Sequence, residues 1–219
     1  MTVLVIKRVF RLTLRAAQGV SLSAIVTGLI LGWLICLGLN SPQRLVRCFC
    51  KIYVSFYRGT PLLVQLILIF YALPAVGITL SPLLAAVVAL SLNTAAFQGE
   101  ILRAGFNMLP KGQLEAARDF GFSAAQTLFY IQMPQVLRTM MPALINETID
   151  IIKNSALVSV VAVHELMRVT QTLASTTYRP LEFYTACGLL YFLTSWGLSI
   201  AGVRLEKNRS SSAKRVLAK

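Results

Sequence analysis

The sequence predicts an all-α integral membrane protein: five transmembrane helices, an N-terminal amphipathic helix at the membrane surface and a short cytoplasmic helix. Apolar residues make up 56% of the 219 residues and charged residues only 13%, about half the share found in soluble domains. The bases, which give a net charge of +13, lie between and after long uncharged segments. This placement indicates membrane topology and argues against a nucleic-acid-binding protein.

Residues 1–18 are expected to form the amphipathic helix, in contact with membrane lipid. Lys7, Arg8, Arg11 and Arg15 interrupt every apolar stretch, which excludes the uninterrupted apolar core of a cleavable signal peptide. Between these bases, apolar residues recur at the spacing of one helical face. The segment therefore predicts a helix that lies on the membrane ahead of the first span.

Residues 16–43 and 183–203 contain no charged residue, and each predicts a spanning helix, which needs about 20 apolar residues. Residues 145–163 predict a further span that is lined by polar groups, because three charged residues lie within its first half. A charge at the centre of a bilayer costs about 2.5 to 3.5 kcal/mol on the insertion scale. These charges should therefore face protein or water.

Residues 59–99 are also uncharged and are too long for one crossing. Pro74 and Gly77 supply turn signals near the middle of this segment. Ser81 followed by Pro82 fits the N-cap and first position of a new helix. The segment therefore predicts two spans, which brings the expected total to five.

The distribution of bases predicts the topology. Several Lys and Arg residues lie between the first and second spans, between the third and fourth spans, and in the tail at residues 206–219. By the positive-inside rule these parts are cytoplasmic. A membrane domain of five spans at residues 19–205 then places the N-terminus outside, despite its own bases.

The long loop at residues 110–135 predicts two short helices joined by an elbow. Residues 113–120 are good helix formers, and Gly121 can adopt the left-handed conformation that ends a helix. Ser123 and Gln126 fit a capping box that begins the second helix at once. Small residues along the first helix suit close docking against a partner protein.

The spacing in this loop resembles the EAA loop of ABC importer permeases. Glu115-Ala116-Ala117 is followed at the family's distances by Gly121 and by the Ile-Gln-Met-Pro block of residues 131–134. The family usually has leucine where this block has methionine, which is a volume-conserving change.

Blocks at residues 57–65, 93–103 and 153–157 are similar to the polar amino acid branch of the same family. The resemblance extends over nearly the whole chain. It implies a multi-pass permease subunit of a bacterial inner-membrane importer that translocates polar amino acids, for which a cationic substrate is a hypothesis taken up below. It also implies a coupling helix, formed around Glu115, Ala116, Ala117 and Gly121, that contacts an ATPase.

The partners implied by the resemblance are a dimer of ATPase subunits, a second permease chain that is identical or homologous, and a periplasmic amino-acid-binding protein. The chain contains no Gly-x-x-x-x-Gly-Lys-Ser/Thr phosphate loop, so ATP and Mg²⁺ are expected on the ATPase and no cofactor on this chain. We expect no enzymatic activity here. The four cysteines and the single histidine, His164, lack the spacing of a metal site.

The predicted substrate path is lined by Asn93, Asn146, Glu147, Asp150 and Asn154. Glu147 and Asp150 are separated by three residues and share a helical face. Pairing of Asp150 with Lys153 would leave Glu147 without a local partner, and intramembrane acids often mark a transport path. This acidic face motivates the hypothesis of a cationic substrate.

Simpler interpretations remain open for several of these residues. Glu100 can pair with Arg103, and Glu115 with Arg118, each across one helical turn. The block at residues 57–65 can begin a helix, with Thr60 as N-cap, Pro61 as first residue and Arg58 at lipid phosphates.

Two other classes of function compete with the permease. A secondary transporter or channel for small polar solutes also needs polar groups at depth, but it predicts an internal repeat that is not evident here. An intramembrane enzyme would need a Gly-x-Ser-x-Gly or His-Glu-x-x-His motif, and the sequence contains neither.

Overall fold

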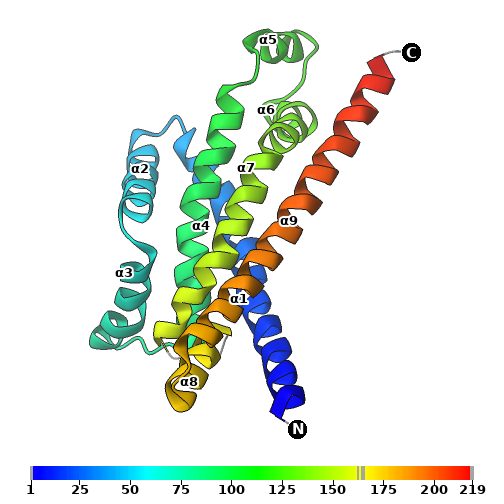
Figure 1. The fold of residues 1–219 in the computed structure, drawn as a ribbon. Coiled ribbons are helices and arrows are strands. Elements are labelled where there is room, and N and C mark those ends of the chain that lie inside the picture. Colours follow the sequence, from blue (N-terminus) through cyan, green and yellow to red (C-terminus); the bar gives the residue numbers. More distant parts are fainter. Residues whose placement is uncertain (1, 162, 164–165, 218–219) are drawn as a thin grey trace.

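The computed structural model describes residues 2–161, 163 and 166–217, and the side chains within 19–204 of that range. In these residues the chain is helical throughout, as predicted, and forms the elongated bundle of Figure 1. The α-helices are α1 (Thr2–Leu39), α2 (Arg44–Gly59), α3 (Leu62–Ile67), α4 (Pro82–Asn107), α5 (Lys111–Asp119), α6 (Ala124–Gln126), α7 (Met133–Asn154), α8 (Leu166–Thr177) and α9 (Pro180–Leu217).

Four short segments of other helical types join these elements. Leu68–Ala72 and Thr127–Gln132 form π-helical turns, and Leu73–Val76 and Ser155–Val161 form 3-10 turns. Such turns often occur where a helix bends or ends.

Helix α4 lies at the centre of the bundle and crosses α1 at close range. The two backbones approach each other closely at Gly32 and Gly99: a Cβ atom on Gly32 would lie 3.1 Å from the carbonyl oxygen of Ala95, and one on Gly99 would lie 3.0 Å from that of Gly32. Small residues permit such approach in membranes, where packing rather than water drives helix association. The crossing also contains a hydrogen bond of 2.6 Å between the hydroxyls of Thr27 and Ser91.

The start of α4 agrees with the sequence analysis. Ser81 is the N-cap and accepts a hydrogen bond from the backbone N–H of Leu84 at 3.3 Å, with Pro82 at the first helical position. Gly77 precedes it with a φ of 84°, in the left-handed region that glycine adopts without strain. The predicted turn between the second and third spans is therefore confirmed.

The basic segment between the first two predicted spans is a helix rather than a loop. Helix α2 covers this segment, and a bend of 108° at its end leads into residues Leu62–Val76. The structure differs from the sequence analysis here because a search for uncharged runs overlooks a helix whose bases lie along one side.

Among the described residues, three helical segments are long and apolar enough to cross a membrane, namely Gly19–Leu39, Pro82–Asn107 and Pro180–Arg204. The bent pair formed by α2 and residues Leu62–Val76 raises the number to four. The fourth predicted span, at residues 145–163, is displaced: α7 begins at Met133 and ends at Asn154, where a 3-10 turn follows. Because of its charged residues, α7 is not among the helices that are apolar enough to cross a membrane, so the total of five spans stays a prediction.

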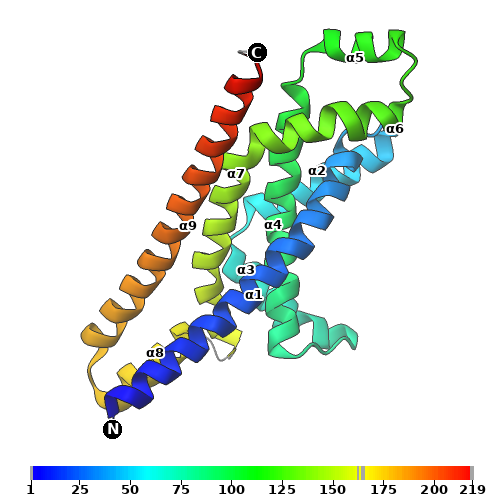
Figure 2. The ribbon, with the colours of Figure 1, turned by 90° about the vertical axis from the view of Figure 1, so that its right-hand side faces the viewer.

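Helices α5 and α6 lie at one end of the bundle, together with the end of α9, and the start of α1 lies at the opposite end (Figures 1 and 2). The described ends of the chain, residues 2 and 217, lie at opposite ends of the bundle, and the placement of the N-terminus outside the membrane stays a prediction. Helix α1 passes residue 18 without a break and α9 continues through residue 206. The side chains of residues 1–18 and 206–219, and His164, lie outside the described part of the chain.

Candidate functional site

The elbow at one end of the bundle begins with α5, which ends in a complete Schellman motif. Gly121 has a φ of 78°, and its N–H donates to the carbonyl of Arg118 at 2.9 Å. The N–H of Phe122 donates to the carbonyl of Ala117 at 3.0 Å. These two bonds satisfy carbonyls that would otherwise lack a partner at the helix end. The left-handed cap predicted for Gly121 is confirmed.

The second arm of the elbow begins at Ser123, two residues after this cap. The Ser123 hydroxyl accepts a hydrogen bond from the N–H of Gln126 at 3.2 Å, and the Gln126 side chain accepts one from the N–H of Ser123 at 2.8 Å. This is the predicted capping box. The chain then passes through the π-helical turn of residues Thr127–Gln132 into α7, so the elbow is connected directly to the start of that helix.

Helix α5 lies at the outer end of the bundle (Figure 2). Glu115 and Ala116 are exposed, whereas Ala117 is only 4% exposed and faces inward. Phe120, at the corner of the elbow, is 83% exposed. In the described part of the chain Glu115 forms no ion pair with Arg118, in contrast to the simpler interpretation. An exposed aromatic side chain beside a helix of small residues is typical of a docking surface.

The second predicted site, on α7, divides into an inner and an outer part. Glu147 accepts a hydrogen bond of 2.8 Å from the hydroxyl of Thr94, which is fully buried on α4. Asp150 points away from α4 and pairs with Lys153 at 3.0 Å, with 59% of its side chain exposed. The predicted pairing of Asp150 with Lys153 is confirmed. Glu147, for which the sequence indicated no partner, has one on another helix.

The three asparagines of the predicted path lie in different surroundings. Asn146 is exposed on α7, and Asn154 is half-buried at the end of that helix. Asn93 is buried on α4, where its amide nitrogen donates to the Gln65 side-chain oxygen at 2.9 Å and to the Tyr57 carbonyl at 3.3 Å. Asn93 therefore faces the bend between α2 and α3, not the acids of α7.

Gln65, which the sequence analysis did not single out, is the centre of that bend. Its amide nitrogen donates to the carbonyls of Tyr57 and Thr60 at 2.8 and 3.0 Å and to the Thr60 hydroxyl at 2.8 Å. The bend breaks the backbone ladder, and Gln65 satisfies carbonyls released at the end of α2. The sequence did contain a signal for Gln65, because this residue is the last one of the family-like block at residues 57–65.

The same geometry corrects the predicted helix start at this block. Pro61, not Thr60, is the N-cap residue of α3, and no side chain caps the helix. The Thr60 hydroxyl instead donates back to the carbonyl of Phe56 at 2.8 Å. The Thr60 side chain therefore hydrogen-bonds the last turn of α2, and the Gln65 side chain links α3 to the end of α2.

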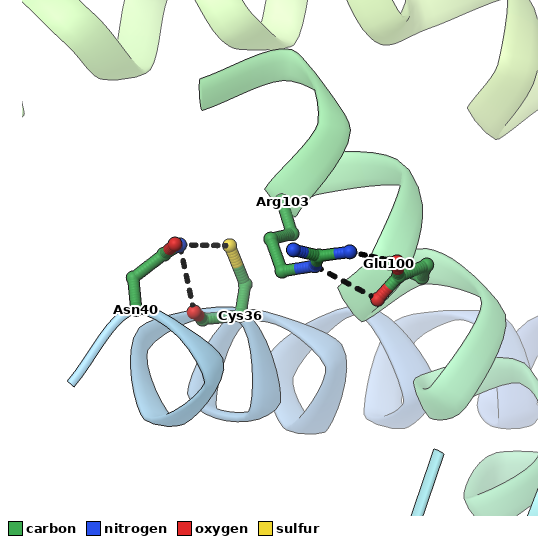
Figure 3. A network of polar contacts seen from close by, with 4 residues as sticks. All are labelled: Cys36, Asn40, Glu100 and Arg103. Atoms are coloured by element: carbon green, nitrogen blue, oxygen red, sulfur yellow. Dashed lines mark hydrogen bonds and ion pairs between the residues drawn. The ribbon is translucent and has the colours of Figure 1, made fainter. Parts of the chain in front are cut away.

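A further polar cluster lies where α1, α2 and α4 meet. Arg103 donates through Nε to Glu100 at 3.0 Å and through Nη2 to the other carboxylate oxygen (Figure 3). The predicted pairing is thus confirmed. Cys36 lies on the other side of the Arg103 guanidinium and accepts from the Asn40 amide. The four cysteines form no disulfide, and the described residues contain no cluster of three or more metal-ligating side chains.

Comparison with known proteins decides the family. The sequence pattern of the binding-protein-dependent transport system inner membrane component family matches residues 7–210. The chain belongs to this family. The resemblance noted in the EAA-like loop is thereby confirmed, and it extends over both arms of the elbow and the acids of α7.

Characterised relatives are similar over most of their length. The chain is 38% identical to the arginine transport system permease protein ArtQ of Bacillus subtilis, over 88% of each chain. It is 38% identical to the L-cystine transport system permease protein TcyB of the same organism, over 83% of this chain and 78% of that one. A putative glutamine transport system permease protein, GlnP of Rickettsia conorii, is 35% identical over 85% and 86%.

Solved structures agree with this assignment. A crystal structure of an amino acid ABC transporter with histidines superimposes with a TM-score of 0.87 at 33% identity, over 94% of this chain and 97% of that chain. An inward-facing structure of the MetNI methionine ABC transporter has a TM-score of 0.78 at 19% identity, over 91% and 95%. The second similarity supports the fold alone.

Proposed function

We propose that this chain is the permease subunit of an inner-membrane ABC importer for polar amino acids. In this proposal it pairs with a second permease chain and receives substrate from a periplasmic binding protein. ATP and Mg²⁺ are bound by a separate ATPase dimer, so this chain binds neither and catalyses no reaction. The family membership and the amino acid permeases among its relatives support the proposal.

The single observation that carries the coupling role is the elbow. Its two arms are fixed by a Schellman motif and a capping box, and its outer face leaves Glu115, Ala116 and Phe120 exposed. A rigid projection of this kind can transmit a displacement of a docked partner to α7, to which it is directly connected. We therefore assign Glu115, Ala116, Ala117 and Gly121 to the ATPase contact.

Copurification tests this assignment. The tagged chain, expressed with an ATPase and a sister permease from the same operon, should retain the ATPase in detergent. ATP hydrolysis should increase when liganded binding protein is added to the complex. An ATPase that elutes separately from a folded permease would contradict the proposal.

We further propose that the substrate is a cationic amino acid and that Glu147 is the carboxylate that meets it. Glu147 accepts one hydrogen bond, from Thr94, and forms no ion pair with any described residue. The charge of Asp150 is balanced by its ion pair with Lys153, so Asp150 contributes less to cation attraction than the sequence alone suggested. An acid that forms no ion pair at membrane depth attracts a cation strongly, because the local dielectric constant is low. Asn146 and Asn154 would line the same path.

Replacement of Glu147 by glutamine tests the substrate class, because the amide keeps the Thr94 hydrogen bond and removes the charge. Arginine uptake should fall about tenfold, which corresponds to roughly 1.4 kcal/mol, while any glutamine uptake should be unchanged. Asp150→Asn is the matched control, with a smaller effect expected. Equal loss of both substrates in Glu147→Gln would indicate a structural acid.

A further inference from the structure

A pocket of about 190 Å³ lies between α2 and α4, and none of the residues assigned to the transport path lines it. Its polar lining consists of Lys51, Ser55, Arg58, Glu100 and Arg103, and two aliphatic side chains complete it. The volume is several times that required by one water molecule. The pocket therefore has room for a small charged group.

The charge of this pocket is positive. Glu100 is held by two nitrogens of Arg103 (Figure 3), so that this pair is neutral as a unit. Lys51 and Arg58 form no ion pair with any described residue. The two unpaired cations lie on one face of α2, about two helical turns apart. The lining is thus arranged for an anion.

The donor chemistry is that of a phosphate site. The guanidinium of Arg58 lies over the ring of Phe97, 5.4 Å from its centroid. Stacking of this kind orients the guanidinium and leaves its in-plane N–H groups free to donate. Lys51 adds a mobile cation and Ser55 a hydroxyl, and guanidinium, ammonium and hydroxyl donors together are typical ligands of phosphate oxygens.

The outer face of α2 indicates what carries the phosphate. A second stripe on this helix consists of exposed apolar side chains, namely Leu45, Phe49, Ile52 and Phe56. Their spacing of four, three and four residues defines one helical face, which lies about 140° around the helix from the face that bears Lys51 and Arg58. A lipid whose anionic head occupies the pocket would reach this stripe only with acyl chains that pass around α2, whereas a free anion would use only the pocket.

The depth of the pocket agrees with such a ligand. Helix α2 lies in the half of the bundle that is nearer to the α5 elbow (Figure 1). If the elbow is cytoplasmic, as the proposed function requires, the pocket opens at the level of the cytoplasmic leaflet. Anionic lipids attract basic residues at this level, by about 1 kcal/mol each.

We propose that this pocket binds the phosphate of an anionic glycerophospholipid in the cytoplasmic leaflet. Lys51, Ser55 and Arg58 bind the phosphate oxygens, and the apolar stripe of α2 packs against the acyl chains. Glu100 limits the affinity, because it occupies Arg103 and places a negative charge at the edge of the site. The lipid is then a structural ligand that fixes α2 and its bend against α4.

Native mass spectrometry of the purified full chain, titrated with phosphatidylglycerol or phosphatidylcholine, tests this proposal. The wild type should retain phosphatidylglycerol in preference to phosphatidylcholine. Lys51→Gln and Arg58→Gln should each weaken phosphatidylglycerol binding about fivefold, the equivalent of one cationic contact. Lys51→Arg should bind as the wild type does, and Glu100→Gln should bind more tightly, a gain that mere destabilisation cannot produce.

Arg44→Gln is the matched control, because it removes the same charge from the exposed start of α2 outside the pocket. An equal loss of phosphatidylglycerol binding in this control would show that the lipid is held by general attraction to surface charge, and it would overturn the proposal. Binding of inorganic phosphate as tight as that of phosphatidylglycerol would overturn the lipid assignment. Lipid binding is measured without the ATPase, so failure of ATPase copurification would refute the proposed function and leave this result unaffected.

Discussion

Gly121 provides the sharpest test of how the elbow works. Its φ of 78° lies in the left-handed region, and apart from its two chain neighbours no residue has a heavy atom within 4 Å of the position that a Cβ would take. A substitution there meets no steric contact with neighbouring elements, so its effect is confined to backbone conformation. Alanine, asparagine and valine then form a series that differs in tolerance of positive φ.

The expected magnitudes follow from the backbone preference. For a residue with a Cβ, the left-handed conformation costs about 1 to 2 kcal/mol of conformational free energy. The cost is higher for a β-branched residue and lowest for asparagine. Valine would also displace the two hydrogen bonds of the Schellman motif, each worth about 1 kcal/mol. We expect ATPase affinity to fall about fivefold for Gly121→Ala and about thirtyfold or more for Gly121→Val, where 1.4 kcal/mol is tenfold.

The assay is a titration of ATPase onto the detergent-solubilised permease, with membrane yield and elution volume as controls for folding. Gly121→Asn should remain close to the wild type. Asparagine as damaging as valine would show that side-chain bulk at the interface, not the left-handed cap, determines docking. Unchanged affinity for the ATPase in all three variants would show that the elbow is not part of the ATPase contact.

Three further predictions concern other parts of the chain. Glu115→Lys should weaken ATPase recovery in pull-downs without loss of membrane insertion, because it places a like charge near Arg118; recovery equal to the wild type would contradict it. Gln65→Leu should lower the thermal midpoint in detergent by an amount equivalent to about 2 kcal/mol, since it leaves buried carbonyls at the bend without donors; an unchanged midpoint would show that water replaces the amide. A cysteine at Thr2 should react with an impermeant maleimide on intact spheroplasts and one at Ser211 should not, and the reverse pattern would refute the topology.

The sequence was sufficient for features that depend on a few adjacent residues. The Ser81 cap, the Gly121 cap and the Ser123–Gln126 capping box are local, and all three form as predicted. The same holds for the pairs Glu100–Arg103 and Asp150–Lys153, which span one helical turn. Each is decided by a spacing of three or four residues, which the sequence contains directly.

The sequence was insufficient where distant segments meet. The hydrogen bond from Asn93 to Gln65 joins residues 28 apart, and that from Thr94 to Glu147 joins residues 53 apart. Single-sequence patterns carry no information on such pairs. The start of α7 was misplaced for a related reason: hydropathy identifies uncharged runs, whereas α7 has charged residues that are accommodated by exposure or by hydrogen bonds to α4.

Uptake of radiolabelled arginine into proteoliposomes tests the central claim most directly. The account predicts ATP-dependent uptake only when this chain, its sister permease, the ATPase and the binding protein are all present, and none when any one is omitted. Uptake of arginine by this chain alone, driven by an ion gradient and indifferent to ATP, would identify a secondary transporter or channel and contradict the account.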